Sequence, residues 1–293
     1  MRVGFIGLGV MGSRMTKRLI EADFDVVVYN RTKEKMAPFV ELGAKAADSI
    51  EELAKQSDVV CTCLSMPDDV VQVYEIVFEH AKQGTICVDF TTVGIDTSQN
   101  MAKRGEEKGI IFLDAPISGG PEGAEAGTLT IMVGGNKQAY ENILPMFQVL
   151  GENIQHLGAS GMGSVAKLMN QYLVAVHSLA ASEAMVVGTA LGLDSEQLYH
   201  ILKSSYGDSR MLRRHMEHYV LDREFAPGGA VKYVHKDVRL ANQLMNLAGL
   251  KKFTGNMAQE AFQEAIDQGL ADEDMSAVIK PLENETNTIV KRS

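Results

Sequence analysis

One lysine stands inside a long apolar stretch of this 293-residue chain, with two amide side chains shortly after it. The stretch runs from Gly161 to Leu193, lacks Pro and is rich in Ala, Leu, Met and Val, which predicts a long helix, about 161–192, that is mostly buried. Lys167, Asn170 and Gln171 share one face of that helix, because side chains three and four residues apart are neighbours. Lys167 is therefore a candidate general acid–base; the alternative is a lysine that snorkels to solvent or pairs with a carboxylate.

A glycine pattern at the start of the chain indicates dinucleotide binding. The predicted strand Arg2–Ile6 runs directly into Gly7-Leu8-Gly9-Val10-Met11-Gly12, and a helical pattern follows over Ser13–Ala22. In this context the first glycine permits a tight turn, the second lets the backbone approach a pyrophosphate, and the third lets the helix pack on the strand. The free N–H groups of the helix N-terminus would bind the phosphates. A glycine-rich turn without a ligand is the alternative.

The end of the second predicted strand, Val26–Tyr29, carries Asn30-Arg31-Thr32. Folds that bind NAD usually place an acidic residue here to bind the ribose 2′-hydroxyl. In this chain a guanidinium takes that place, and Arg31 and Thr32 can together bind a 2′-phosphate. The sequence therefore favours NADP, with NAD possible if Arg31 only faces solvent.

Later strand ends supply further candidate residues. Strands are predicted at Val59–Leu64, Thr85–Phe90 and Ile110–Leu113, with a helix at Asp68–Glu79. Because strand ends in such a sheet face the cofactor crevice, the loops holding Leu64, Ser65 and Thr92 are candidate walls of the nicotinamide site. The small residues Ser118-Gly119-Gly120 offer backbone N–H groups to a substrate carboxylate, or else form a plain turn.

The order of these motifs resembles the β-hydroxyacid dehydrogenase family over essentially the whole chain. The motifs that carry the resemblance are the glycine pattern, Asp114-Ala115-Pro116-Ile117-Ser118-Gly119-Gly120, the Gly161–Gln171 segment and Lys236-Asp237. The resemblance implies an α/β Rossmann-type N-terminal domain, a long interdomain helix and an all-α C-terminal domain. It also implies hydride transfer between NAD(P)(H) and a small 3-hydroxy acid or semialdehyde, as in 3-hydroxyisobutyrate dehydrogenases.

The resemblance also assigns roles to individual residues. Lys167 matches the family's catalytic lysine, and Asn170 matches the asparagine that positions the substrate or the lysine. Ser118, Gly119 and Gly120 match the loop that binds the substrate carboxylate. Lys236 matches a lysine near the nicotinamide and the substrate, and Thr92 matches a threonine that touches the cofactor. No metal is implied.

One departure bears on the substrate. Many members carry Asn-Asn where this chain has Asn170-Gln171, and Gln171 resembles the tartronate semialdehyde reductase branch. An NADPH-dependent reductase of tartronate, glyoxylate or succinic semialdehyde is therefore an alternative to a 3-hydroxyisobutyrate oxidiser. Imine reductases of the same architecture and catalytically dead binding modules usually lack the lysine, so Lys167 argues against both. Lysine starts near pKa 10.4, so alcohol oxidation requires that this pKa be lowered by burial or by a neighbouring cation, for which Lys236 is the candidate. Oxidation is then expected to run best at alkaline pH.

Composition limits the cellular context. The length predicts two domains, a dinucleotide-binding domain at 1–160 and a helical domain for substrate binding and oligomerisation at 161–293. The net charge of −10 disfavours nucleic-acid and membrane partners but allows a small carboxylate substrate in a basic pocket. Three cysteines without metal spacing predict reduced thiols, and a strand pattern from Arg2 predicts no signal peptide, so a cytoplasmic protein is expected. The family implies a homodimer or homotetramer.

The second half is helical throughout by its pattern. Helices are predicted over 196–204, 232–248, 255–268 and 275–285, the first of them capped by Asp194 or Ser195. Polar residues within the long helix, such as His177 and Glu183, argue against a membrane span.

Overall fold

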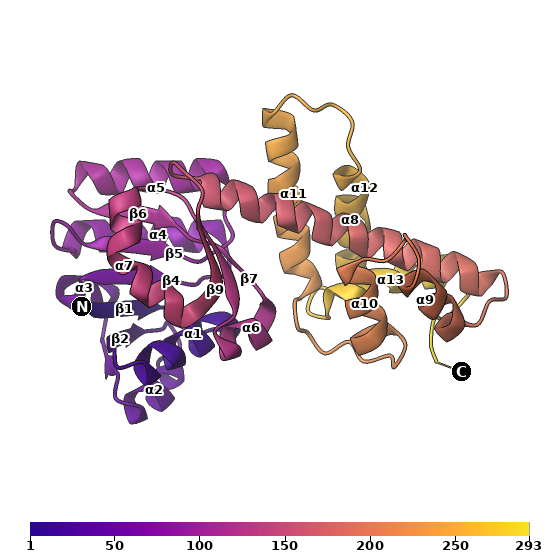
Figure 1. The fold of residues 1–293 in the computed structure, drawn as a ribbon, viewed down its shortest axis with the longest axis horizontal. Helices are drawn as coiled ribbons and strands as arrows, with labels where there is room; N and C mark the ends of the chain where they lie inside the picture. The colour runs from indigo at the N-terminus through magenta and orange to yellow at the C-terminus, as the bar shows by residue number, and fades with distance from the viewer. Residues whose placement is uncertain (293) are drawn as a thin grey trace. The chain divides into compact units, whose positions relative to one another are not determined.

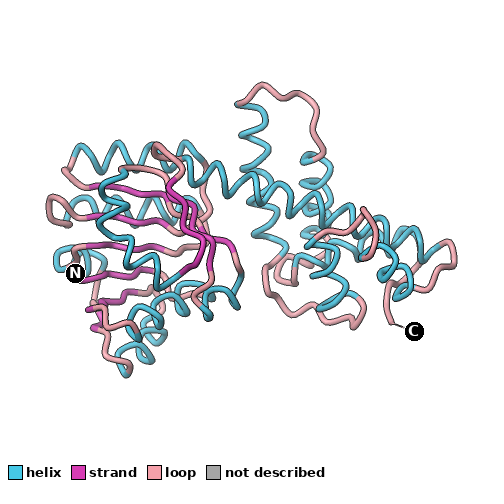
Figure 2. Tube along the Cα trace, in the orientation of Figure 1, coloured by secondary structure: helices cyan, strands magenta, loops and turns pink. Residues whose placement is uncertain are grey.

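The computed structural model describes residues 1–292, which divide into two compact units, Met1–Lys167 and Leu168 onward. Figure 1 follows the chain through them, and Figure 2 shows every named strand in the first unit. The predicted domain boundary at residue 160 immediately precedes α8 (Met162–Ala190), and the division into units falls within that helix. The helix thus begins in the first unit and continues through the second.

The first unit is built on a six-stranded parallel sheet in the order β3-β2-β1-β4-β5-β6. This is the strand order of a Rossmann fold, so the predicted fold class is confirmed. Apart from the short, exposed edge strand Lys45–Ala46, its strands are largely apolar because helices cover both faces of the sheet. The strands are β1 (Arg2–Ile6), β2 (Asp25–Tyr29), β3 (Lys45–Ala46), β4 (Val59–Thr62), β5 (Ile86–Asp89) and β6 (Ile111–Asp114).

Two separate hydrophobic clusters lie on the two faces of this sheet. One includes Met15 and Leu19 of α1 (Val10–Glu21) with Phe147 of α7 (Lys137–Leu150). The other joins residues of α3 (Ile50–Gln56), α4 (Pro67–His80) and α5 (Ile95–Glu107). Pro67 occupies the first helical position of α4, as its sequence predicts. The short η1 (Lys33–Met36) and α2 (Ala37–Glu41) connect β2 to β3.

A second, three-stranded sheet is absent from the sequence-based prediction. It contains β7 (Ile117–Ser118), β8 (Leu129–Val133) and β9 (Gly151–His156), with α6 (Gly120–Ala126) between the first two. The polar sequence of β9 explains the omission, since only Gly151 of its six residues is buried. The predicted helix Ser13–Ala22 also begins earlier than expected, at Val10, because its N-terminus lies inside the glycine motif.

The second unit is helical, as predicted. Asp194 caps α9 (Ser195–Lys203), accepting a hydrogen bond from the Gln197 N–H at 2.9 Å. The predicted helix at 275–285 is in fact a 3₁₀ turn followed by an α-helix, η3 (Met275–Val278) and α13 (Ile279–Thr286). The remaining helices are α10 (Arg210–His215), the π-helical turn η2 (Met216–Val220), α11 (Val231–Leu247) and α12 (Gly255–Asp267).

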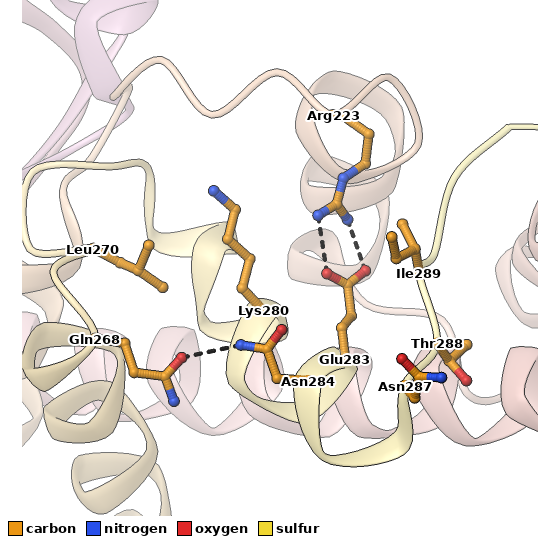
Figure 3. A pocket seen from close by; sticks show the side chains of 9 residues that line it. All are labelled: Arg223, Gln268, Leu270, Lys280, Glu283, Asn284, Asn287, Thr288 and Ile289. Atoms are coloured by element: carbon orange, nitrogen blue, oxygen red, sulfur yellow. Dashed lines mark hydrogen bonds and ion pairs between the residues drawn. The ribbon is translucent and has the colours of Figure 1, made fainter.

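An ion pair anchors the C-terminal segment beside a hollow of about 450 Å³ in the second unit. Figure 3 shows the Arg223 guanidinium pointing at the buried Glu283 carboxylate, with two contacts of 2.7 and 2.9 Å. The same carboxylate accepts the Val290 N–H at 2.9 Å, so it holds the end of the chain against the helices. Lys280 of the hollow pairs with Glu273, so both cations lining it are already neutralised and it offers no free charge to an anion.

Helix α8 is the one helix among residues 1–292 whose length and composition would suffice to cross a membrane. Core helices of soluble proteins have the same properties. Ala175 and Leu179 pack into one helical core cluster and Met185 into another. Leu173 and Val187 on the other side of the helix are exposed, so α8 is less buried than its sequence predicts.

Candidate active site

The glycine loop between β1 and α1 has the geometry that a dinucleotide requires. Gly7 adopts φ +99°, and its N–H donates to the Tyr29 carbonyl at 3.1 Å. A Cβ on Gly12 would lie 2.0 Å from the Gly7 carbonyl oxygen, so the helix can approach the strand only with glycine there. A Cβ on Gly9 would meet no protein atom within 4 Å. The space beside Gly9, at the N-terminus of α1, therefore suits a pyrophosphate.

Asn30 holds this loop, and Arg31 and Thr32 stand beside it. The Asn30 side-chain oxygen accepts the Leu8 N–H at 2.9 Å, and its amide nitrogen donates to the Thr32 carbonyl at 2.9 Å. Arg31 and Thr32 are exposed, and within residues 1–292 no hydrogen bond or ion pair is recorded for the Arg31 guanidinium. The predicted cluster at the end of β2 thus contains one residue that shapes the loop and one cation available to a ligand.

The Leu64–Ser65 loop is fixed by a buried hydrogen-bond network. The Leu64 N–H donates to the Thr91 hydroxyl at 2.9 Å, and the Thr91 N–H donates in turn to Asp89 Oδ1 at 3.0 Å. The Thr62 hydroxyl donates to the same oxygen at 2.7 Å. Thr92, the predicted cofactor contact, follows directly and is half-buried. Asp89 therefore organises both loops that were predicted to line the nicotinamide site.

Asp89 itself is an unusual group in this position. Only 1% of it is exposed, and its Oδ2 has no hydrogen-bond partner within the described residues. Burial raises the pKa of Asp89 to about 6, against the opposing effect of hydrogen bonds from Thr91 and Thr62. Asp114, its in-register partner on the neighbouring strand β6, raises that pKa further by charge repulsion.

The predicted carboxylate-binding loop lies where β7 turns into α6. Ser118 ends β7, and Gly119 and Gly120 follow with φ of +141° and +69°, values that favour glycine. Helix α6 is fastened to α1, because Arg18 donates to the Glu125 carbonyl at 3.0 Å. The loop is therefore held on the same helix that follows the dinucleotide motif.

Lys167 is buried, with 8% of its surface exposed, in the second turn of α8. The start of this helix is capped by Asp114, a carboxylate from β6. Its Oδ1 accepts the Gly161 N–H at 2.7 Å and its Oδ2 accepts the Ser164 N–H at 2.9 Å. Burial raises the pKa of Asp114, and the N–H groups of Gly161, Ser164 and Gly163 counteract the shift.

The other predicted substrate residues form a polar chain in the second unit. Asn170 donates to the Gln171 side-chain oxygen at 3.0 Å, and Gln171 donates to Asp237 Oδ2 at 2.5 Å. Lys236 lies 2.9 Å from the other oxygen of Asp237, and both of these residues are buried. Gln171 therefore links α8 to α11, a role that the sequence comparison with Asn-Asn members does not reveal.

Three carboxylates of the site have no role in the sequence-based prediction: Asp89, Asp114 and Asp237. The sequence does contain a signal for Asp89, because a carboxylate within the apolar run Ile86–Phe90 has to be hydrogen-bonded or protonated. The partners of the other two are 47 and 66 residues away in the chain, so no local pattern predicts them. Within residues 1–292 no group of three or more His, Cys, Asp or Glu side chains is placed to hold a metal ion.

Comparison with known proteins assigns both halves of the chain. Residues 2–158 match the family model for the NAD-binding domain of 6-phosphogluconate dehydrogenase. Residues 161–282 match the family model described as the NAD-binding part of NADP-dependent 3-hydroxyisobutyrate dehydrogenase. The chain is 36% identical to 2-(hydroxymethyl)glutarate dehydrogenase of Eubacterium barkeri, over 99% of this chain and 97% of the relative. It is 33% identical to the NAD-dependent L-serine dehydrogenase of Pseudomonas aeruginosa, covering 95% and 97%.

A solved structure gives the same result for the fold. The 3-hydroxyisobutyrate dehydrogenase of Mycobacterium tuberculosis, solved with L-serine, superposes with a TM-score of 0.88 at 29% identity. The match covers 96% of this chain and 98% of that one.

Replacing Asp89 with Asn should change the pH dependence of stability. Between the usual pKa of 3.8 and the folded value of about 6, the unfolded carboxyl ionises while the folded one keeps its proton. Raising the pH from 4.5 to 7.5, which covers about two thirds of this effect, therefore destabilises the wild type by about 2 kcal/mol that Asp89→Asn does not lose. Urea unfolding at pH 4.5 and 7.5 measures the difference, with the exposed Asp96→Asn as control. Equal pH slopes for wild type and Asp89→Asn would show that Asp89 is ionised throughout.

Proposed function

The chain belongs to the β-hydroxyacid dehydrogenase family, and we propose that it interconverts a small 3-hydroxy acid and its semialdehyde with Lys167 as the general acid–base. It is a nicotinamide-dependent oxidoreductase acting on a hydroxy acid. The observation that carries the residue assignment is a buried lysine on a helix whose start is tied to the strand leading into Ser118-Gly119-Gly120.

The relatives suggest a common substrate skeleton. 3-Hydroxyisobutyrate, L-serine and 2-(hydroxymethyl)glutarate, which their names contain, are all 3-hydroxypropanoates that differ only in the substituent at carbon 2. The proposed substrate therefore has a carboxylate, a primary alcohol two carbons away, and one variable group. An aldehyde replaces the alcohol in the oxidised form, which also fits a semialdehyde reductase working in the opposite direction.

The proposed roles follow the chemistry of each group. The glycine loop and the N-terminus of α1 bind the dinucleotide, whose nicotinamide supplies the hydride-transfer chemistry. Backbone N–H groups of Ser118-Gly119-Gly120 orient the substrate carboxylate. Lys167 holds the substrate oxygen and takes its proton during oxidation, or gives the proton back during reduction. Asn170, one turn further along α8, is proposed to orient the substrate, and Gln171 and Lys236 are proposed to complete the polar lining.

NADP is the proposed cofactor, with NAD as the alternative. The support is the Arg31 guanidinium at the end of β2, in the place where NAD-binding folds carry an acid. Lys33 and Lys35 are also exposed in the next turn, which adds positive charge there. The family model for residues 161–282 bears an NADP-dependent name, whereas the Pseudomonas aeruginosa relative bears an NAD-dependent one.

Self-association through α8 is proposed for the oligomer, a homodimer or a homotetramer assembled from such dimers. Five residues on one side of the helix, together with Leu191 directly after its end, are exposed within an arc of about 80° at 100° per residue: Leu173, His177, Ala180, Ala184, Val187 and Leu191. Their spacing alternates between four and three, the pattern of a helix-pairing seam. They are also symmetric about Ser182, so a second copy running antiparallel would pair Leu with Leu and Ala with Ala, as a two-fold interface requires.

A cytoplasmic location is proposed as well. Its support is that Cys61, Cys63 and Cys87 are all free thiols in the structure, as expected in a reducing compartment. A small carboxylate, rather than a nucleic acid or a membrane, is the proposed partner of this acidic chain.

Removing the Lys167 amine should abolish turnover without weakening cofactor binding. Lys167→Ala is expected to lower kcat about 10²–10⁴-fold, because the proton would lose its carrier. Lys167→Arg should be similarly inactive, since it keeps the positive charge but cannot release a proton. The assay follows nicotinamide absorbance with both cofactors and a panel of 3-hydroxyisobutyrate, L-serine, 2-(hydroxymethyl)glutarate and the semialdehydes of tartronate and succinate, together with glyoxylate.

Each outcome of that assay has a clear meaning. Turnover of one of the three 3-hydroxypropanoates or of tartronate semialdehyde by the wild type identifies the variable group and the direction. Turnover of glyoxylate or succinic semialdehyde alone would contradict the proposed skeleton, because their aldehyde is not two carbons from the carboxylate. Retention of more than a tenth of the activity by Lys167→Ala would exclude Lys167 as the general acid–base. Cofactor binding without any turnover across the panel would contradict the proposed substrate skeleton.

The Arg31 proposal predicts a change in cofactor preference. Arg31→Ala should raise KM for NADPH about tenfold or more, the value of one or two charge-assisted hydrogen bonds, while KM for NADH stays nearly constant. Lys137→Ala, which removes an exposed cation from α7 of the same unit, is the control. A wild-type enzyme that uses only NADH would refute the role of Arg31.

The α8 seam predicts a change in molecular mass. Ala184→Arg should shift the protein toward monomer in analytical ultracentrifugation, because a charged side chain at the centre of the seam prevents close helix approach. Gln138→Arg adds the same charge on an exposed helix of the first unit and should leave the mass unchanged. An Ala184→Arg protein with wild-type mass would rule out this seam.

A further inference from the structure

Asp114 connects two parts of the proposed site through a single carboxylate. It ends β6, four residues before Ser118 of the carboxylate-binding loop. Its two oxygens accept the N–H groups of Gly161 and Ser164, at the start of the helix that carries Lys167. Lys167 follows Ser164 by three residues, so it lies on the same face of the helix, about 4.5 Å further along its axis.

The surroundings of this carboxylate are shaped to hold it in one place. A Cβ on Gly134 would lie 2.6 Å from Asp114 Oδ1, and a Cβ on Gly163 would lie 2.9 Å from Oδ2. A Cβ on Gly163 would also come within 2.1 Å of the Met132 carbonyl oxygen. The backbone of Asp114 is fixed too, because its carbonyl accepts the Gly134 N–H at 2.8 Å. Substitution of either glycine would displace the carboxylate or the helix.

A cap from so far away is not what helix formation alone requires. Helices are normally capped by a Ser, Thr, Asn or Asp that immediately precedes them, whereas the residue directly before α8 is Gly161, which has no capping side chain. The carboxylate used instead comes from 47 residues earlier and is 1% exposed, which makes its desolvation costly. What the distant cap adds is a fixed position of the helix relative to the strand.

We infer that Asp114 is a positioning residue that sets the distance between Lys167 and the carboxylate-binding loop Ser118-Gly119-Gly120. The inference rests on the proposed function, since it assumes that Lys167 transfers the proton. Asp114 is 1% exposed and each of its oxygens accepts a backbone N–H group, so it is placed to act through the helix and not by contact with a ligand. Its effect passes through the helix: when the cap is lost, the first turn of α8 shifts and the amine leaves the position in which it meets the substrate oxygen. Displacements of about 1 Å in such groups lower rates about 10²-fold.

Asp114→Asn tests the inference. It keeps the size of the side chain but replaces one of the two accepting oxygens with an NH₂ group, which cannot accept a hydrogen bond from the backbone N–H group that faces it. The expected result is a kcat lower by about 10- to 100-fold, with the dissociation constant for NADPH changed less than twofold. Asp114→Ser is prepared alongside it as a milder change, since a hydroxyl can still cap the helix once. Asp194→Asn alters the cap of α9 in the second unit and should leave kcat unchanged.

The deciding measurement combines each variant with Lys167→Ala. If Asp114 acts through the lysine, the loss caused by Asp114→Asn or Asp114→Ser shrinks to less than about threefold once the lysine is gone. A general loss of structure would not depend on Lys167. Losses that multiply in the double variants, or an unchanged kcat in both single variants, would overturn the inference and leave the proposed function standing. If Lys167→Ala alone stays active, the proposed function fails and the inference fails with it.

Discussion

Two carboxylates buried side by side at the carboxyl ends of β5 and β6 constrain everything around them. Asp89 and Asp114 are in-register partners and each is 1% exposed. Two neighbouring carboxyl groups in an apolar setting do not ionise equally, because each raises the pKa of the other. Asp114 receives two backbone N–H donors at its two oxygens, whereas one oxygen of Asp89 has none. The two backbone donors therefore stabilise a negative charge on Asp114, whereas burial raises the pKa of Asp89 to about 6.

The two carboxylates support different elements. Asp114 faces the N-terminus of α8, where the helix dipole favours negative charge. Asp89 accepts the Thr62 hydroxyl, which also contacts Tyr74, and it accepts the N–H of Thr91, whose hydroxyl holds the Leu64 loop. The edge of the sheet thus supports the lysine on one side and the cofactor loop on the other.

Some glycines of the first unit are required by packing within the protein, whereas one is explained only by a ligand. A Cβ would collide with backbone at Gly12, Gly134 and Gly163, so these glycines serve contacts within the protein. At Gly9 a Cβ would meet nothing, and its φ of −76° suits any residue. A glycine that neither packing nor backbone conformation requires is best explained by a ligand that approaches the main chain there, which is the role that the motif assigns to it.

Sequence predicted the elements of this protein well and the connections between them poorly. The Rossmann unit, the long helix and most helix bounds follow from local periodicity and capping, which need only neighbouring residues. The three-stranded sheet was missed because β9 is largely exposed and polar, and its register depends on pairing with β8 across α7. The contacts that join Asp114 to Gly161 and Asp237 to Gln171 were missed for the same reason, since these partners are 47 and 66 residues apart in the chain.

Gln171 shows what this means for substrate choice. Sequence comparison places it beside Asn170 and suggests a contact with substrate, yet its side chain reaches Asp237 of α11, which also pairs with Lys236. An asparagine there is one methylene shorter, so an Asn-Asn member would have to make a different connection between the two helices. A change at Gln171 therefore alters the connection between α8 and α11 and, with it, the placement of Asn170 and Lys236 within the second unit.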